Sequence, residues 1–167
     1  DSFPKPVIAA INGMALAGGL ELCLACDLAV ASTDARIGDQ HANFGLVAGA
    51  GGSQRLPRII GPRRAKELLF TGDWITATEA ERIGLVNKVV PPDKLEAEAM
   101  ALAKKIASHS PMAAKTVKAL VNRGLQMELP DALELEVNMG VLHTTSEDMA
   151  EGLKAFEEKR KPNFPGR

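Results

Sequence analysis

The chain has 167 residues, of which 46% are hydrophobic and 25% are charged, and its 20 Lys and Arg nearly balance its 21 Asp and Glu. This composition is typical of a globular protein and excludes the disordered, collagen-like and membrane-spanning classes. The net charge of −1, with only five Phe and one Trp, gives no support to a surface for nucleic acid or acidic lipid. We therefore expect a globular chain that binds neither nucleic acid nor a membrane.

The first forty residues alternate between predicted strands and a helix. The apolar run at residues 7–11 is typical of a buried strand, and two glycines at 18–19 precede an expected apolar helix over 20–26. Further strands are predicted at 28–31 and 36–38. This order indicates an α/β layer whose strands are buried on both faces.

The next fifty residues predict short helices and one strand. A helix is expected to start at Ser53, and Pro62 suits the first position of the following helix. Thr76 begins a capping box for a short helix that Gly84 would end. Residues 85–90 are predicted to form an edge strand.

Helical periodicity dominates the rest of the chain. Apolar residues at 4-3-4 spacing predict a helix over 95–106, and Ser110 with Pro111 marks the start of the next. Two more helices are expected, one after Pro130 and one through Phe156.

The two cysteines, Cys23 and Cys26, have the spacing of a redox dithiol. Their apolar flanks contain no Lys or Arg that would lower a thiol pKa, which favours two buried structural thiols. Two cysteines alone cannot complete a tetrahedral zinc site, and no metal site is predicted.

The glycine pair and the glutamate that follows are the first candidates for chemistry. The N–H of Gly18, at a strand-to-helix junction, could stabilise a developing oxyanion, although Gly18 and Gly19 could equally serve a tight turn. Glu21 lies one helical turn later, so its carboxylate could reach the same ligand, or it could simply interact with the helix dipole. No Gly-x-Gly-x-x-Gly motif or phosphate loop occurs.

His41 stands in a polar stretch that is typical of a loop. It could act as an acid or base, or have only a structural role. Asp39 and Asn43 are neighbouring polar candidates. No role is assigned to His109 or His143.

Several short motifs occur in a fixed order along the chain: KPVIAAING (5–13), ALAGGLE (15–21), CD (26–27), GAGGSQRLP (49–57), LFTG (69–72), the pattern over 80–86 and the pattern over 156–160. Together these motifs resemble the enoyl-CoA hydratase/isomerase (crotonase) superfamily. The resemblance covers essentially the whole chain.

The resemblance implies an α/β fold of the crotonase-like (ClpP/crotonase) class. Residues 1–92 would form an N-terminally incomplete ββα spiral, and residues 93–167 a C-terminal helical region that builds homotrimers or hexamers. A segment of the same protein before Lys5 would supply the first oxyanion N–H and much of the CoA cradle. The chain is therefore expected to be the C-terminal two-thirds of a family member.

The resemblance also implies an acyl-CoA substrate and a set of site residues. Gly18 would be the second oxyanion donor, Glu21 the first catalytic glutamate, and Gly49 a glycine whose backbone places the water. Lys159 and Arg160 would reach CoA phosphates or serve only to solvate a helix end. No metal or cofactor is implied beyond the CoA of the substrate, and the expected location is cytoplasmic, or the mitochondrial matrix in a eukaryote.

The chain departs from the family pattern at its second catalytic position. His41 stands where a second glutamate is usual, beside Gln40 where proline is usual, and Ala17 and Ala48 replace a common glycine and a common proline. The favoured activity is hydration of a 2-enoyl-CoA. Because only one carboxylate remains, an isomerase or another enolate-forming lyase is the alternative, and a non-catalytic structural subunit is a further one.

Overall fold

The computed structural model describes residues 3–167, which form two compact units. One unit is Val7–Leu102, and the other combines residues 3–6 with Ala103–Arg167. The predicted domain division after residue 92 stays a prediction. Within residues 3–167, no helix has both the length and the apolar character that crossing a membrane requires.

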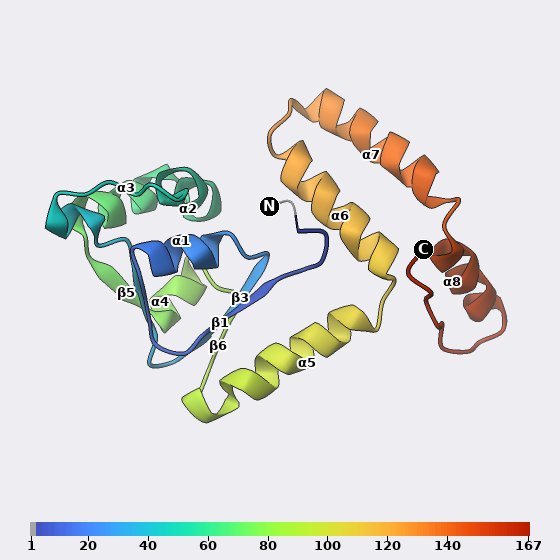
Figure 1. Ribbon diagram of the computed structural model, residues 1–167, viewed down its shortest axis with the longest axis horizontal. Helices are drawn as coiled ribbons and strands as arrows, with labels where there is room; N and C mark the ends of the chain where they lie inside the picture. Colours follow the sequence, from blue (N-terminus) through green and yellow to red (C-terminus); the bar gives the residue numbers. More distant parts are fainter. Residues whose placement is uncertain (1–2) are drawn as a thin grey trace. The chain divides into compact units, whose positions relative to one another are not determined.

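The first unit contains two small sheets (Figure 1). The first sheet has three parallel strands in the order β1 (Ile8–Ile11), β3 (Leu28–Ser32) and β6 (Lys88–Val90). The second has the order β2 (Met14–Leu16), β4 (Arg36–Gly38) and β5 (Trp74–Thr76), with β2 parallel and β5 antiparallel to β4. The pairs β1–β2 and β3–β4 each supply one strand to each sheet and are followed by helices, whereas α4 lies between β5 and β6.

The helices of this unit are short and cover the sheets. They are α1 (Gly18–Leu24), the 3-10 helix η1 (His41–Phe44), α2 (Gly52–Ile60), α3 (Pro62–Thr71), α4 (Ala77–Arg82) and the 3-10 helix η2 (Pro92–Lys94). Leu20, Ile37, Leu56 and Ala80 are each at most 1% exposed and belong to one apolar core. Because α1 packs against β2 and α2, its first turn is fixed between a strand and a helix.

Most predicted elements of this unit are confirmed, although α1 begins at Gly18 and ends at Leu24 instead of spanning 20–26. Three further details were wrong. The strands β2 and β5, which have three residues each, were not expected from the sequence. The strand expected over 85–90 is shorter, because the N–H groups of Leu85 and Val86 both donate to the carbonyl oxygen of Ala80, at 2.8 and 3.4 Å, and hold this stretch in a turn. Only Lys88–Val90 pairs with β3.

Cys23 in α1 and Cys26 just after it are half-buried rather than buried, and neither forms a disulfide. Burial raises the pKa of the Cys23 thiol, and the nearby Cys26 thiol raises it further. Both residues line a cavity of about 160 Å³ that none of Gly18, Glu21 and His41 lines. A thiol with a raised pKa is a poor nucleophile, which agrees with the structural role predicted for these residues.

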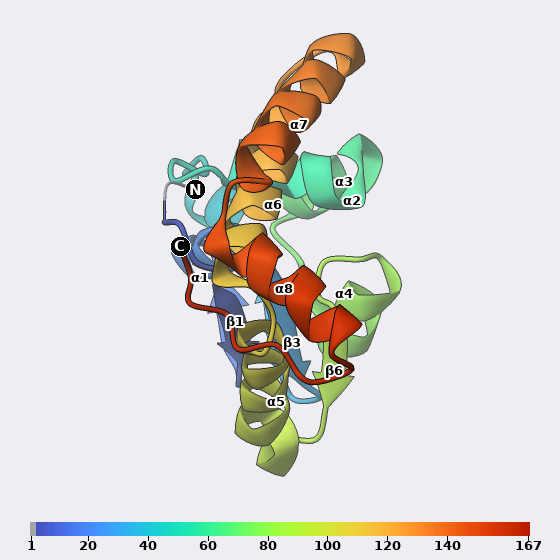
Figure 2. The same ribbon diagram turned by 90° about the vertical axis from the view of Figure 1, so that its right-hand side faces the viewer.

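The second unit consists of helices, as expected (Figure 2). α5 (Leu95–Ala107) begins in the first unit and crosses into this one at Ala103. The second unit continues through α6 (Pro111–Gly124), α7 (Leu129–His143) and α8 (Glu147–Glu157). The hydroxyl of Ser110 accepts the N–H of Ala113 at 2.9 Å, and the hydroxyl of Ser146 accepts the N–H of Met149 at 3.2 Å. These N-caps explain where α6 and α8 begin.

A buried carboxylate joins the ends of these helices. Asp148 is 1% exposed and accepts hydrogen bonds from the Ser110 hydroxyl at 2.5 Å, the Met112 N–H at 3.2 Å and the Gly166 N–H at 2.6 Å. Burial acts to raise the pKa of the Asp148 carboxyl, but the hydrogen bonds from Ser110 and the backbone together lower it. The carboxylate therefore stabilises the fold above its unfolded pKa of about 4, and this contribution is lost as the pH falls through the lowered folded pKa.

Replacing Asp148 by Ala is expected to lower the free energy of unfolding by about 2–4 kcal/mol, because several buried donors lose their acceptor. Asp131→Ala is the matched control, since Asp131 is an exposed residue of α7 and its loss should cost at most about 1 kcal/mol. Urea denaturation at pH 7 measures both. Equal costs for the two variants would contradict the role given to Asp148.

Candidate active site

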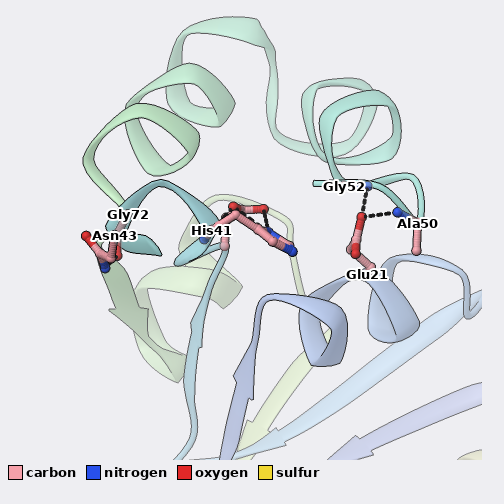
Figure 3. Close-up of polar contacts among 7 residues, drawn as sticks. Glu21, His41, Asn43, Ala50, Gly52 and Gly72 are labelled. Atoms are coloured by element: carbon pink, nitrogen blue, oxygen red, sulfur yellow. Dashed lines mark hydrogen bonds and ion pairs between the residues drawn. The ribbon is translucent and has the colours of Figure 1, made fainter. Parts of the chain in front are cut away.

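Glu21 is a buried carboxylate held by two backbone N–H groups. It lies in the first turn of α1 and is 4% exposed. Its Oε1 accepts the N–H of Ala50 at 2.7 Å and the N–H of Gly52 at 2.8 Å (Figure 3). No hydrogen bond of Oε2 occurs among the residues that the structure describes. One oxygen therefore fixes the carboxylate, and the other remains for a ligand.

Gly52 leaves no room for a larger residue beside this carboxylate. A Cβ built on Gly52 would lie 3.2 Å from both Cγ and Oε1 of Glu21 and 3.0 Å from Cβ of Ala48. Gly52 is also the first residue of α2, so its N–H belongs to the positive end of a helix. The glycine thus lets the helix end approach the carboxylate closely.

Gly18 and Gly19 border open space at the start of α1. A Cβ built on either residue would have no heavy atom within 4 Å beyond its immediate chain neighbours and helix backbone. Packing within the described chain therefore does not require glycine here. The first N–H groups of a helix have no acceptor within that helix, so the Gly18 N–H is a donor suited to a ligand oxygen.

Ala17 precedes α1 in a backbone conformation that favours glycine. It has φ 49° and ψ −117°, its N–H donates to the carbonyl oxygen of Gly38 at 3.0 Å, and its own carbonyl oxygen accepts the Glu21 N–H at 3.1 Å. A residue with a Cβ is strained in this region, at a cost of about 1–3 kcal/mol. The strain is stored where the chain turns from β2 into the helix that carries Glu21.

Ala17→Gly should therefore raise the free energy of unfolding by about 1 kcal/mol, because relief of strain exceeds the entropy that glycine adds to the unfolded chain. Ala101→Gly provides a control of opposite sign: Ala101 is exposed inside α5, where glycine should cost about 1 kcal/mol. Thermal or urea unfolding of the two variants tests this pair. Destabilisation by both would show that Ala17 is not strained.

The side chains of His41 and Asp39 are in contact. The sequence had indicated only that Asp39 is a polar neighbour of His41. His41 Nδ1 lies 2.8 Å from Oδ1 and 3.0 Å from Oδ2 of Asp39, and the His41 N–H donates to Oδ1 at 3.1 Å. The Asp39 side chain is 2% exposed and the His41 side chain is 15% exposed. Figure 3 shows the His41 ring pointing toward the side of the site on which Glu21 lies. Figure 3 draws this histidine–carboxylate pair and the buried Glu21 carboxylate in one region of the first unit.

Asn43, the other neighbouring candidate, has a structural contact. Its Nδ2 donates to the carbonyl oxygen of Gly72 at 2.9 Å, and a Cβ built on Gly72 would lie 2.6 Å from Oδ1 of Asn43. The Asn43 side chain therefore links η1 to the end of α3 through this hydrogen bond. Nothing in its contacts indicates a role in proton transfer.

Gly49 lies in the exposed loop between η1 and α2, directly before Ala50. The loop is anchored on both sides of Ala50, since the Ala50 N–H binds Glu21 and its carbonyl oxygen accepts Arg55 Nη1 at 3.0 Å. The role predicted for the Gly49 backbone in placing a water molecule stays a prediction.

The comparisons with known proteins identify the family. The family model described as "Enoyl-CoA hydratase/isomerase" matches residues 1–167. The chain belongs to this family. It is 46% identical over 98% of its length to a protein named "Crotonyl-CoA hydratase" from Syntrophomonas wolfei, and 46% identical over 94% of its length to a "Short-chain-enoyl-CoA hydratase" from Clostridium acetobutylicum. It spans 63% and 60% of the lengths of those relatives.

Solved structures of enoyl-CoA hydratases share the fold. A crystal structure from Bacillus anthracis has a TM-score of 0.95 at 48% identity, covering 99% of this chain and 64% of that chain. One from Geobacillus kaustophilus has a TM-score of 0.94 at 46% identity, covering 98% of this chain and 64% of that chain. The expected crotonase-like α/β fold is confirmed.

The two residues predicted to meet CoA phosphates in this enoyl-CoA hydratase/isomerase family member lie in the helical unit. Arg160 forms ion pairs with two glutamates of this unit. Its Nη1 and Nη2 donate to Oε1 and Oε2 of Glu151 at 2.6 and 2.9 Å, and its Nε donates to Oε2 of Glu158 at 2.6 Å. These contacts raise the pKa of Arg160, and hydrogen bonds from Arg160 and from the Asn163 N–H lower the pKa of Glu151 to about 2. A phosphate would compete with two carboxylates for Arg160, so the CoA contacts of Lys159 and Arg160 stay a prediction. Within residues 3–167, no cluster of three or more His, Cys, Asp and Glu could hold a metal ion.

Proposed function

We propose that the chain carries the acid–base residues of an enoyl-CoA hydratase, which adds water across the 2,3 double bond of an acyl-CoA thioester. One observation carries the proposal: the buried Glu21, fixed through Oε1 by two N–H groups, shares a site with the Asp39–His41 pair. The names of the relatives at 46% identity, a crotonyl-CoA hydratase and a short-chain-enoyl-CoA hydratase, support it.

The proposed reaction proceeds through an enolate. The thioester oxygen accepts the Gly18 N–H and one donor from elsewhere in the protein, which stabilises the negative charge that develops there. Water forms a bond to the β-carbon while its proton passes to His41 Nε2. Glu21, protonated at Oε2, delivers its proton to the α-carbon. No cofactor beyond the CoA of the substrate is proposed, because the thioester itself stabilises the enolate.

Isomerisation of a 3-enoyl-CoA is the second candidate, favoured because residue 41, where the family resemblance implies a second glutamate, is a histidine. Moving a double bond needs only one group that removes and returns a proton, which Glu21 alone could do. A further alternative is a non-catalytic subunit that keeps the fold for assembly.

Two assays on the full-length protein separate these functions. Hydration of crotonyl-CoA with little isomerisation of a 3-enoyl-CoA supports the hydratase. The reverse preference supports the isomerase, and absence of both reactions supports the non-catalytic alternative.

The assembly and location are also proposals. We propose a homotrimer or hexamer of the full-length protein, in which a preceding segment completes the oxyanion site. Exposed apolar side chains of the helical unit support the assembly: Val117, Val121, Leu125, Leu129, Leu133, Val137, Val141, Leu142, Leu153 and Phe156. We propose a cytoplasmic location, or the mitochondrial matrix in a eukaryote; a human relative at 43% identity is named as mitochondrial.

A further inference from the structure

Among the residues that the structure describes, the polar contacts of the buried Asp39 carboxylate all lie on His41. It is 1% exposed, and its side-chain oxygens meet the ring Nδ1 and the backbone N–H of His41. Within the described part of the chain, no Lys or Arg lies at ion-pairing distance from it. An unpaired buried carboxylate is costly, so this arrangement persists only because His41 supplies its hydrogen-bond donors.

The backbone around this pair is built to bring the two side chains together. Asp39 directly follows β4, whose last residue, Gly38, is so close to β5 that a Cβ on it would lie 2.7 Å from Cα of Trp74. Gln40 then has φ 63° and ψ −6°, a left-handed conformation that turns the chain and returns the His41 ring to Asp39. Proline, which the family resemblance implies as the usual residue here, is fixed near φ −65° and could not make this turn.

The contact decides which ring nitrogen carries the proton. A carboxylate accepts only, so in neutral His41 the proton is on Nδ1 and donates to Asp39, which leaves a lone pair on Nε2. Nε2 is the ring nitrogen remote from Asp39, and the ring points toward the Glu21 side of the site (Figure 3). When Nε2 takes a proton, the negative charge of Asp39 stabilises the imidazolium that forms, as in catalytic triads of other enzymes.

We infer that Asp39 is a positioning residue that holds His41 in the Nδ1–H tautomer, so that Nε2 accepts the proton of the water added in the proposed hydration. The inference rests on the proposed function for its reaction, but the tautomer is a property of the protein itself. Asp39 acts through His41 and does not touch the substrate. This Asp–His pair takes the place of the second carboxylate of the family pattern.

The tautomer can be measured without any variant. The ¹⁵N chemical shifts of the His41 ring distinguish a protonated nitrogen from an unprotonated one. We expect a protonated Nδ1 and an unprotonated Nε2 in the neutral ring, and Asp39→Asn should produce a mixture of the two tautomers. A ring protonated at Nε2 in the unaltered protein would overturn the inference.

A double-mutant cycle tests whether Asp39 acts through His41. Asp39→Asn should lower kcat of hydration by about 10²-fold or more and change KM by less than about threefold, whereas in a His41→Ala background it should have almost no further effect. Asp34→Asn, an exposed aspartate at the other end of β4, is the matched control and should leave kcat unchanged. Independent, multiplying effects of Asp39→Asn and His41→Ala would overturn the inference. Failure of the unaltered protein to hydrate any enoyl-CoA would overturn the proposed function instead, while the ring tautomer would still decide the role of Asp39.

Discussion

Glu21→Gln is expected to lower kcat for hydration of crotonyl-CoA by about 10³-fold, because an amide cannot transfer the proton that the carboxyl transfers. The fold should survive, since the amide oxygen of Gln can accept the same two N–H groups, from Ala50 and Gly52, that Oε1 accepts now. We expect the free energy of unfolding to change by less than about 1 kcal/mol. The initial rate of loss of the enoyl-thioester absorbance, measured beside a urea denaturation curve, tests both parts.

Glu67→Gln is the matched control for this prediction. Glu67 lies exposed on α3, so the same chemical change should leave kcat unaltered there. Retention of more than a tenth of the activity by Glu21→Gln would show that another group transfers the proton. A large loss of stability would show that the carboxylate serves the fold rather than the reaction.

Gly52→Ala should impair the site through packing rather than through chemistry. Its new Cβ would lie 3.2 Å from Glu21 Oε1 and 3.0 Å from Cβ of Ala48, so the carboxylate or the start of α2 must move. We expect kcat to fall by about 10²-fold, because small displacements of a catalytic group are costly, and the free energy of unfolding to fall by about 1–3 kcal/mol. Initial rates and urea denaturation curves measure the two effects.

Gly140→Ala offers the contrast. Gly140 lies inside α7, and a Cβ on it would have no heavy atom within 4 Å outside its chain neighbours and helix backbone. Gly140→Ala should therefore raise the free energy of unfolding by up to about 1 kcal/mol and leave kcat unchanged. If Gly52→Ala left kcat unchanged, the close approach of α2 to Glu21 would have no importance for the reaction.

Local patterns in the sequence predicted much of the fold. Ser110 and Pro111 located the start of α6, and the apolar run at residues 7–11 located β1, because N-caps and buried strands depend on neighbouring residues. By contrast, β2 and β5 were missed because each has three residues, and both owe their pairing to β4, which is remote in the sequence. Strands this short carry too little alternation to be recognised.

The candidate site was predictable in its side chains but not in its backbone contacts. Glu21 follows from a glycine pair and a carboxylate at helical spacing, but its partners are backbone N–H groups 29 and 31 residues away, which any residue except proline would supply. The spacing of Asp39 and His41 was visible in the sequence. Their pairing depends on the left-handed conformation of Gln40, and glutamine gives no signal for it.

Ala17 also shows that the sequence predicts which residue is present but not its backbone conformation. The family resemblance implied that alanine stands here where glycine is common, and the structure gives the consequence, a positive φ of 49° at the residue before α1. A departure from a pattern can therefore be seen in the sequence, but its energetic cost depends on the dihedral angles.

The arrangement of Glu21 and His41 about the substrate is the central claim, and a crystal structure of the full-length protein with an unreactive enoyl-CoA analogue tests it most directly. We expect the thioester oxygen within hydrogen-bonding distance of the Gly18 N–H, Glu21 Oε2 beside the α-carbon, and His41 Nε2 facing the β-carbon through one water molecule. An analogue bound with its double bond out of reach of both Glu21 and His41 would contradict the account.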